Sequence, residues 1–100
     1  MKIVICLRDL STSPCRNIVE ADREYDFERS DPAADVSDYE TEQGAFEDFV
    51  QQAREVLPIE DQNMDVYIGW WGDQGTFAIP KTFIQLIAET QWPITFNIND

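Results

Sequence analysis

Acidic side chains recur at every second position in one stretch of this 100-residue chain. The alternating carboxylates are Glu20, Asp22, Glu24, Asp26 and Glu28. In an extended strand, alternate side chains point to the same face, so these five would line one face at intervals of about 6.7 Å. A row of like charges of this kind favours electrostatic recognition of a basic partner.

The negative charge of the chain is concentrated around this row. Residues 20–48 hold twelve Asp and Glu but only two Arg, a net charge of −10, whereas the whole chain carries −13. A surface this negative repels nucleic acid and anionic lipid, so direct binding to either is not expected. The alternative that the acids serve solubility alone stays open, because net charge by itself keeps proteins soluble.

The residues needed for common catalytic centres are missing from the sequence. The chain has no histidine, which excludes Ser-His-Asp and Cys-His arrangements, and its four glycines form no phosphate-binding loop. Cys6 and Cys15 do not match zinc-ligand spacing, and residues 60–65 lack the glycine and terminal glutamate of a calcium loop. We therefore expect a protein without catalytic activity, cofactor or metal.

Length and composition predict one folded domain covering residues 1–100. The sequence is 43% hydrophobic and 12% aromatic, which is typical of a soluble globular protein. Its apolar runs are too short to span a membrane, and no signal-peptide core follows Lys2. We expect a cytoplasmic location, with Cys6 and Cys15 as reduced thiols.

The hydrophobic pattern predicts the fold class α+β. Apolar alternation and turn chemistry indicate the order β-β-α-β-β-α-β, forming a two-layer sandwich with a mostly antiparallel sheet of four to five strands and two helices on one face. A helix beginning near Pro14 remains an alternative at the start of the second strand. The predicted strands are Ile3–Leu7, Asn17–Arg29, Asp65–Trp71, Thr76–Ile79 and Ile94–Asn99, with a loop over Ser30–Asp38 and a hairpin turn over Gly72–Gly75.

Each predicted helix has one apolar stripe. The first ends before Pro58 and the second begins at Pro80. The predicted core positions are Phe46, Phe49, Val50, Ala53, Val56 and Leu57 in the first, and Phe83, Ile84, Ile87 and Ala88, with Leu86 on the flank, in the second.

Two adjacent tryptophans, Trp70 and Trp71, end the third predicted strand. Alternation places Trp70 with Met64, Val66 and Ile68, and Trp71 on the other face. One tryptophan is expected in the core and the other across the back of the sheet, where it is either a packing residue or an aromatic anchor for a partner.

The last quarter of the sequence, TFAIPKTFIQLIAETQWPITFNIND, resembles the end of a family of small bacterial domains of unknown function. That family closes with a short strand, a helix and an alternating final strand. In size and acidic composition the chain is similar to bacterial toxin-immunity proteins, including those of contact-dependent growth inhibition systems. This second resemblance implies a cytoplasmic, non-catalytic inhibitor of a basic nuclease toxin, and it assigns no residue roles.

These observations lead to one leading hypothesis and one alternative. The leading hypothesis is a non-catalytic inhibitor that binds a basic protein, most simply an immunity protein against a nuclease toxin. The alternative is a phage-type nucleic-acid mimic such as an anti-CRISPR inhibitor, with a second acidic row formed by Glu40, Glu47, Asp48 and Glu55. The predicted partner-binding residues are Asp22, Glu24, Tyr25, Asp26, Glu28, Asp31, Asp35 and Trp71.

Overall fold

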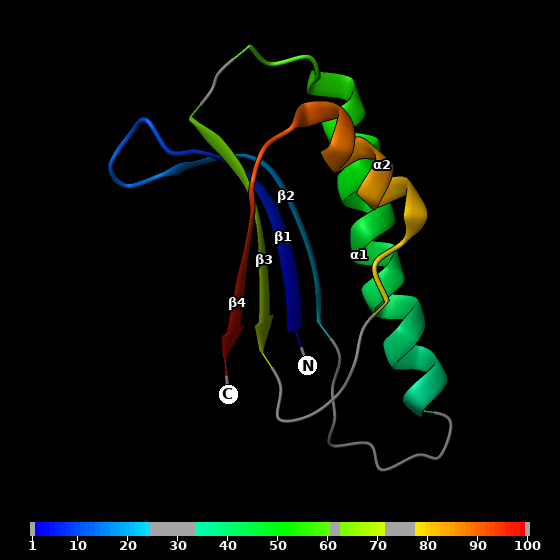
Figure 1. Cartoon of the computed structure of the whole chain (residues 1–100). Coiled ribbons are helices and arrows are strands. Elements are labelled where there is room, and N and C mark those ends of the chain that lie inside the picture. Colours follow the sequence, from blue (N-terminus) through cyan, green and yellow to red (C-terminus); the bar gives the residue numbers. More distant parts are fainter. Residues whose placement is uncertain (1, 25–33, 61–62, 72–77, 100) are drawn as a thin grey trace.

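The computed structural model describes residues 2–24, 34–60, 63–71 and 78–99, with the backbone alone for residues 23, 24 and 34–42. Within these residues, four strands form one sheet in the order β2-β1-β3-β4, and the two helices lie on the same face of it (Figure 1). The elements are β1 (Lys2–Asp9), β2 (Arg16–Glu24), α1 (Ala34–Val56), β3 (Met64–Trp71), α2 (Lys81–Thr90) and β4 (Ile94–Asn99). The predicted α+β class with two helices on one face is confirmed.

Strand pairing is mostly antiparallel, as predicted. The central strand β1 pairs antiparallel with β2 and with β3, whereas β3 and β4 are parallel. Parallel neighbours need a crossover connection, and α2 provides it between β3 and β4.

The core lies between the sheet and the helices. Alternating residues of β1, β2 and β3 face α1, which packs mainly on β1 and β2. The Phe83 ring of α2 meets Phe46 of α1 edge to face, with 4.9 Å between ring centroids. The most deeply buried side chains of the strands are Ile3, Ile5, Leu7, Met64, Val66 and Ile68.

The strand prediction for Asn17–Arg29 is confirmed where the structure describes it. Residues 16–24 form β2, so a helix beginning at Pro14 is not adopted. Residues 25–29, which contain Tyr25, Asp26, Phe27 and Glu28, lie outside the described residues.

Two boundary predictions were wrong. Residues 34–38, expected in a loop, form the first turn of α1, where acidic residues suit the positive end of the helix dipole. Ala78 and Ile79, expected in a strand, are outside any strand and lead into α2. The other residues of that predicted strand, and the predicted hairpin turn Gly72–Gly75, lie outside the described residues.

The helix stripes were predicted only in part. In α1, Val56 is 41% exposed at the last turn, although the four earlier stripe positions are buried. In α2, Leu86 is buried while Ile84 and Ala88 are exposed. The physical reason is that α2 packs chiefly against α1. This contact buries the side of α2 that carries Phe83, Leu86 and Ile87.

Candidate protein-binding face

The sheet face opposite the helices brings the acidic strand β2 together with the half-buried Tyr67 and the exposed Trp71 on one surface. The strand register aligns three rows across it, Glu20–Cys6–Tyr67–Thr95, Asp22–Val4–Gly69–Asn97 and Glu24–Lys2–Trp71–Asn99. These twelve residues, together with Arg8 and Asp65, are called the far face here. No described helix covers it (Figure 1).

The acidic edge of the far face is β2. Glu20 and Asp22 are exposed, and the Asn17 amide donates a hydrogen bond to Glu20 Oε2 at 3.0 Å. Among the side chains that the structure describes, neither carboxylate forms a salt bridge. Their negative charge is therefore available to a partner.

An aromatic platform lies two strands away on β3. A Cβ at Gly69 would come within 2.7 Å of two Trp71 ring carbons and 2.9 Å of Tyr67 Cε1. Only glycine leaves room for both rings to lie along the strand at this point. Trp71 remains 37% exposed, so it presents a large apolar surface to solvent.

Two cations of β1 lie between the acids and the platform. The Arg8 guanidinium carbon is 4.5 Å from the Tyr67 ring centroid, and Lys2 Nζ is 6.0 Å from that of Trp71. These are cation–π distances. The two cations thus contact the rings from the β1 side. From the β4 side, the Asn97 amide donates a hydrogen bond to Tyr67 Oη at 3.0 Å.

The buried carboxylate of Asp65 ties three strands together. Arg8 Nε donates to its Oδ1 at 2.9 Å, and Thr95 Oγ1 donates to its Oδ2 at 2.7 Å. Burial alone would raise the pKa of Asp65, but these hydrogen bonds and the charge of Arg8 outweigh it and hold the pKa below its ordinary value. The carboxylate is therefore ionised at neutral pH and serves the architecture of the far face.

The thiol of Cys6, at the middle of the far face, is not a nucleophile at neutral pH. Burial, together with the smaller effect of the negative charge of Glu20, raises its pKa to about 11. Because the thiolate is the reactive form, this cysteine acts as a small apolar residue. Cys15 is exposed, and both cysteines are free, as predicted.

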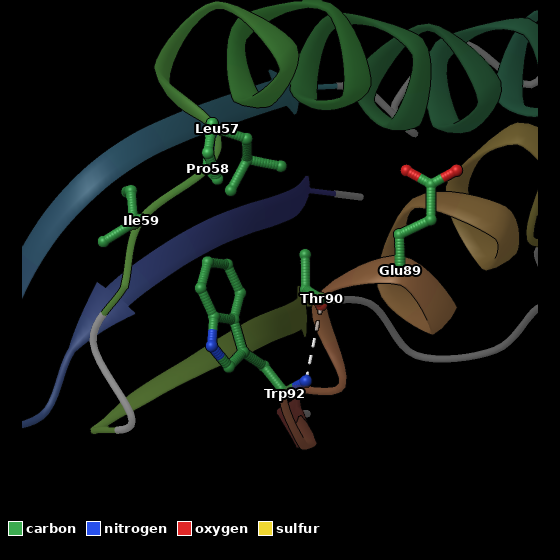
Figure 2. A pocket seen from close by; sticks show the side chains of 6 residues that line it. All are labelled: Leu57, Pro58, Ile59, Glu89, Thr90 and Trp92. Carbon is green, nitrogen blue, oxygen red and sulfur yellow. Dashed lines mark hydrogen bonds between the residues drawn. The ribbon is translucent and has the colours of Figure 1, made fainter.

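A pocket of about 360 Å³ lies away from the far face, at the end of the helix layer. Figure 2 shows that its lining comes from the segment after α1 (Leu57, Pro58 and Ile59), from the end of α2 (Glu89 and Thr90) and from Trp92. Its only charged group is Glu89, and the Thr90 hydroxyl already donates to Ile87 O at 2.8 Å. Without convergent polar groups, the pocket offers little for orienting a ligand.

The structure assembles part of the predicted site. Asp22 and Trp71 share the far face, and Glu24 occupies its register position at the end of β2. Asp35 belongs to the first turn of α1, so the prediction that it lies in a loop was wrong. Tyr25, Asp26, Glu28 and Asp31 lie outside the described residues.

Sequence reasoning missed three contributors to the face. Lys2 and Arg8 were not identified because their position between acids and aromatics depends on strand register. Gly69 carried one signal, since a glycine inside a β-branched and aromatic strand marks a close approach.

Comparisons of the chain with protein-family models, with curated proteins and with solved structures gave no match. In the described part of the chain, no three His, Cys, Asp or Glu side chains gather as metal ligands. No helix among the described residues is both long and apolar enough to cross a membrane.

Proposed function

We propose that this chain is a non-catalytic inhibitor that binds a basic protein, an immunity protein that neutralises a nuclease toxin in the cytoplasm. The observation that carries the proposal is the far face, where the exposed Glu20 and Asp22, which form no salt bridge with any described side chain, lie on the same surface as the partly exposed Trp71. Nuclease sites are basic because they hold phosphates. The acids supply charge complementarity, and Trp71 supplies an anchor of the type that dominates interface energetics.

The nucleic-acid mimic is the weaker alternative because of where its second acidic row lies. Glu47 and Glu55 belong to α1, which covers the opposite face of the sheet from Glu20 and Asp22. A single strand carries a charge about every 6.7 Å, far sparser than one per about 1.7 Å of duplex DNA. A single acidic row beside aromatic residues suits a protein surface better than it imitates a duplex.

The direct test takes as its probe a nuclease toxin domain encoded by a gene next to the gene of this chain, and a neighbourhood that encodes no such domain would contradict the proposal. Cells producing that domain should survive when this chain is co-produced, and the purified chain should block cleavage of nucleic acid by the purified domain. Survival without the chain, or cleavage that continues at excess chain, would contradict the proposal. So would a nuclease, protease or esterase activity of the chain that disappears on mutation of one carboxylate.

A charge-reversal pair tests whether the acidic strand is the interface. Glu20→Lys with Asp22→Lys should slow association with the toxin domain by about tenfold at low salt, because steering by the acidic field is lost. The parent rate should fall between 0.1 M and 1 M salt, as the Debye length shrinks from about 10 Å to about 3 Å. Stopped-flow fluorescence measures both rates.

The matched control reverses two exposed charges on the helix layer, Glu47→Lys with Glu55→Lys. It changes the net charge by the same amount but leaves the far face intact, so association should slow less. Equal slowing in both pairs would show that net charge, and not the acidic strand, governs binding.

A further inference from the structure

The outer strand β4 carries an uncovered apolar row. Ile94, Phe96 and Ile98 are 39%, 50% and 66% exposed, although their register partners Val66, Ile68 and Trp70 are buried. The row is on the helix side of the sheet, but α1 packs on β1 and β2, and α2 packs on α1. The described elements therefore leave this row open to solvent.

The backbone of the same three residues faces the free edge of the sheet. Val66 N donates to Pro93 O at 2.9 Å, which fixes the phase of the parallel ladder. In a parallel pair, the residues whose groups bond to the neighbour alternate along the strand, here 93, 95 and 97. The N–H and C=O groups of Ile94, Phe96 and Ile98 therefore point away from β3.

The strand is symmetric in residue type about Phe96. It reads Ile-Thr-Phe-Asn-Ile over residues 94–98. A second β4 placed antiparallel about a twofold axis at Phe96 pairs Phe96 with Phe96 and Ile94 with Ile98. Each such pair exchanges two backbone hydrogen bonds, and Thr95 lies opposite Asn97 on the other face.

The distribution of charge favours self-association through the β4 edge over the β2 edge. The chain carries −13, and the opposite edge strand β2 contains Glu20, Asp22 and Glu24, so two copies repel each other there. Residues 94–99 contain no charged side chain. The β4 edge is where a second copy meets the least like-charge repulsion.

We propose that β4 is a dimerisation edge, through which two copies of this chain pair antiparallel about Phe96 into one eight-stranded sheet. A twofold axis perpendicular to the sheet keeps the helices of both copies on the same face. Both β2 strands stay free at the outer ends of the sheet. The proposal does not depend on the toxin-binding role and stands or falls separately from it.

The size of the patch sets the strength of the dimer. A stable interface buries about 800 Å² on each partner, whereas three partly exposed side chains make a patch of only a few hundred Å². We therefore expect a dimer that dissociates on dilution, with a Kd in the range of roughly 1–100 μM.

Sedimentation velocity of the full chain from low micromolar to millimolar concentration tests the proposal. The parent should shift from monomer to dimer across this range. Phe96→Lys places two like charges opposite each other at the axis and should raise the Kd by about tenfold or more. Ile98→Pro removes an outward N–H without touching the ladder to β3, and should weaken the dimer similarly.

The matched control is Ile84→Lys, which adds the same charge at another exposed isoleucine, on α2, 56% exposed. It should leave most of the dimerisation in place, and circular dichroism confirms that each variant is folded. A parent that stays monomeric at millimolar concentration overturns the proposal. A dimer that persists in both β4 variants, or is lost equally in Ile84→Lys, also overturns it.

Discussion

The two edge strands of the sheet differ in both charge and cover. On β2, acids occupy the far face while Val19 and Ala21 are buried beneath α1. On β4, neutral polar residues occupy the far face, and the apolar residues on the other side remain exposed. Charged edges resist strand pairing, whereas a neutral edge with free backbone groups permits it. One small sheet thus offers two different surfaces for association.

The edges are also attached by different means. The strand β2 pairs antiparallel with β1 and packs its inner side against a helix. The strand β4 is joined to the sheet by a parallel ladder and by the hydrogen bond from Thr95 to the buried Asp65. We therefore expect changes in packing to affect β2 most, and changes at the polar link to affect β4 most.

The largest effect is expected from Asp65→Ala. It removes the acceptor of Thr95 and leaves Arg8, 23% exposed at its side chain, without its buried partner. The free energy of unfolding should fall by about 3 kcal/mol, as when one member of a buried ion pair is removed. Urea unfolding measures the loss. Hydrogen exchange should accelerate more on β4 than on β2, and equal acceleration would show that Asp65 does not hold the β4 edge in particular.

Removing only the β4 side of the link gives the control. Thr95→Val leaves the Arg8–Asp65 pair intact and should cost about 1 kcal/mol, the value of one hydrogen bond.

The contribution of Asp65 to the free energy of unfolding should decrease at low pH. The pKa of Asp65 is lowered in the folded state, so its stabilisation is complete above the ordinary value of 3.8 and is lost as the pH falls through the folded pKa. The difference in unfolding free energy between parent and Asp65→Ala should therefore narrow below about pH 4. Hydrogen bonds from Ser11 also lower the pKa of Asp9, but Asp9 is present in both proteins and cancels.

A smaller effect compares packing at the two edges. Val19→Ala in β2 removes part of a side chain that is only 4% exposed, and it should destabilise the fold by about 2 kcal/mol. Ile98→Ala in β4, at 66% exposure, should change the stability of the monomer by less than about 0.5 kcal/mol. Thermal unfolding below the concentration of dimer formation measures both. Similar losses would mean that β4 is covered in solution.

The smallest expected effect is a change in the pKa of Cys6 when the negative charge of Glu20 is removed. Glu20 contributes to the raised pKa of Cys6, so Glu20→Gln should lower that pKa, while burial still holds it above the ordinary value. Absorbance of the thiolate in a Cys15→Ser background measures it. Glu55→Gln, on the helix layer, should leave the pKa unchanged. A shift of the Cys6 pKa in Glu55→Gln, without one in Glu20→Gln, would show that the charge of the acidic strand does not act on Cys6.

Hydrophobic periodicity predicted which residues share a face but not what covers that face. In β3 it separated Trp70 from Trp71 correctly, because alternation is a property of the strand itself. It placed Ile84 in the core, although the direction in which α2 turns depends on its contact with α1. The alternation of β4 was recognised, yet the exposure of Phe96 follows from the absence of a described helix above it.

The candidate site was predictable along each strand and not across strands. The alternating acids identified β2, and one tryptophan of β3 was expected across the back of the sheet. Their presence on one surface, with Arg8 and Lys2 between them, depends on the register of three strands, which no local pattern encodes.

The parallel pairing of β4 also orders events in time. The strands β1 and β2 are joined by residues 10–15 alone, and closing so short a loop is fast, so this hairpin should form early in folding. The strands β3 and β4 are separated in the sequence by residues 72–93, which include α2, so their contacts are less local than those of β1 with β2 and should form more slowly. Until β4 pairs with it, β3 has an edge of unpaired backbone N–H and C=O groups to which another strand can bind. The acidic side of the sheet is thus complete first, and the neutral side is open to competing strands for longest.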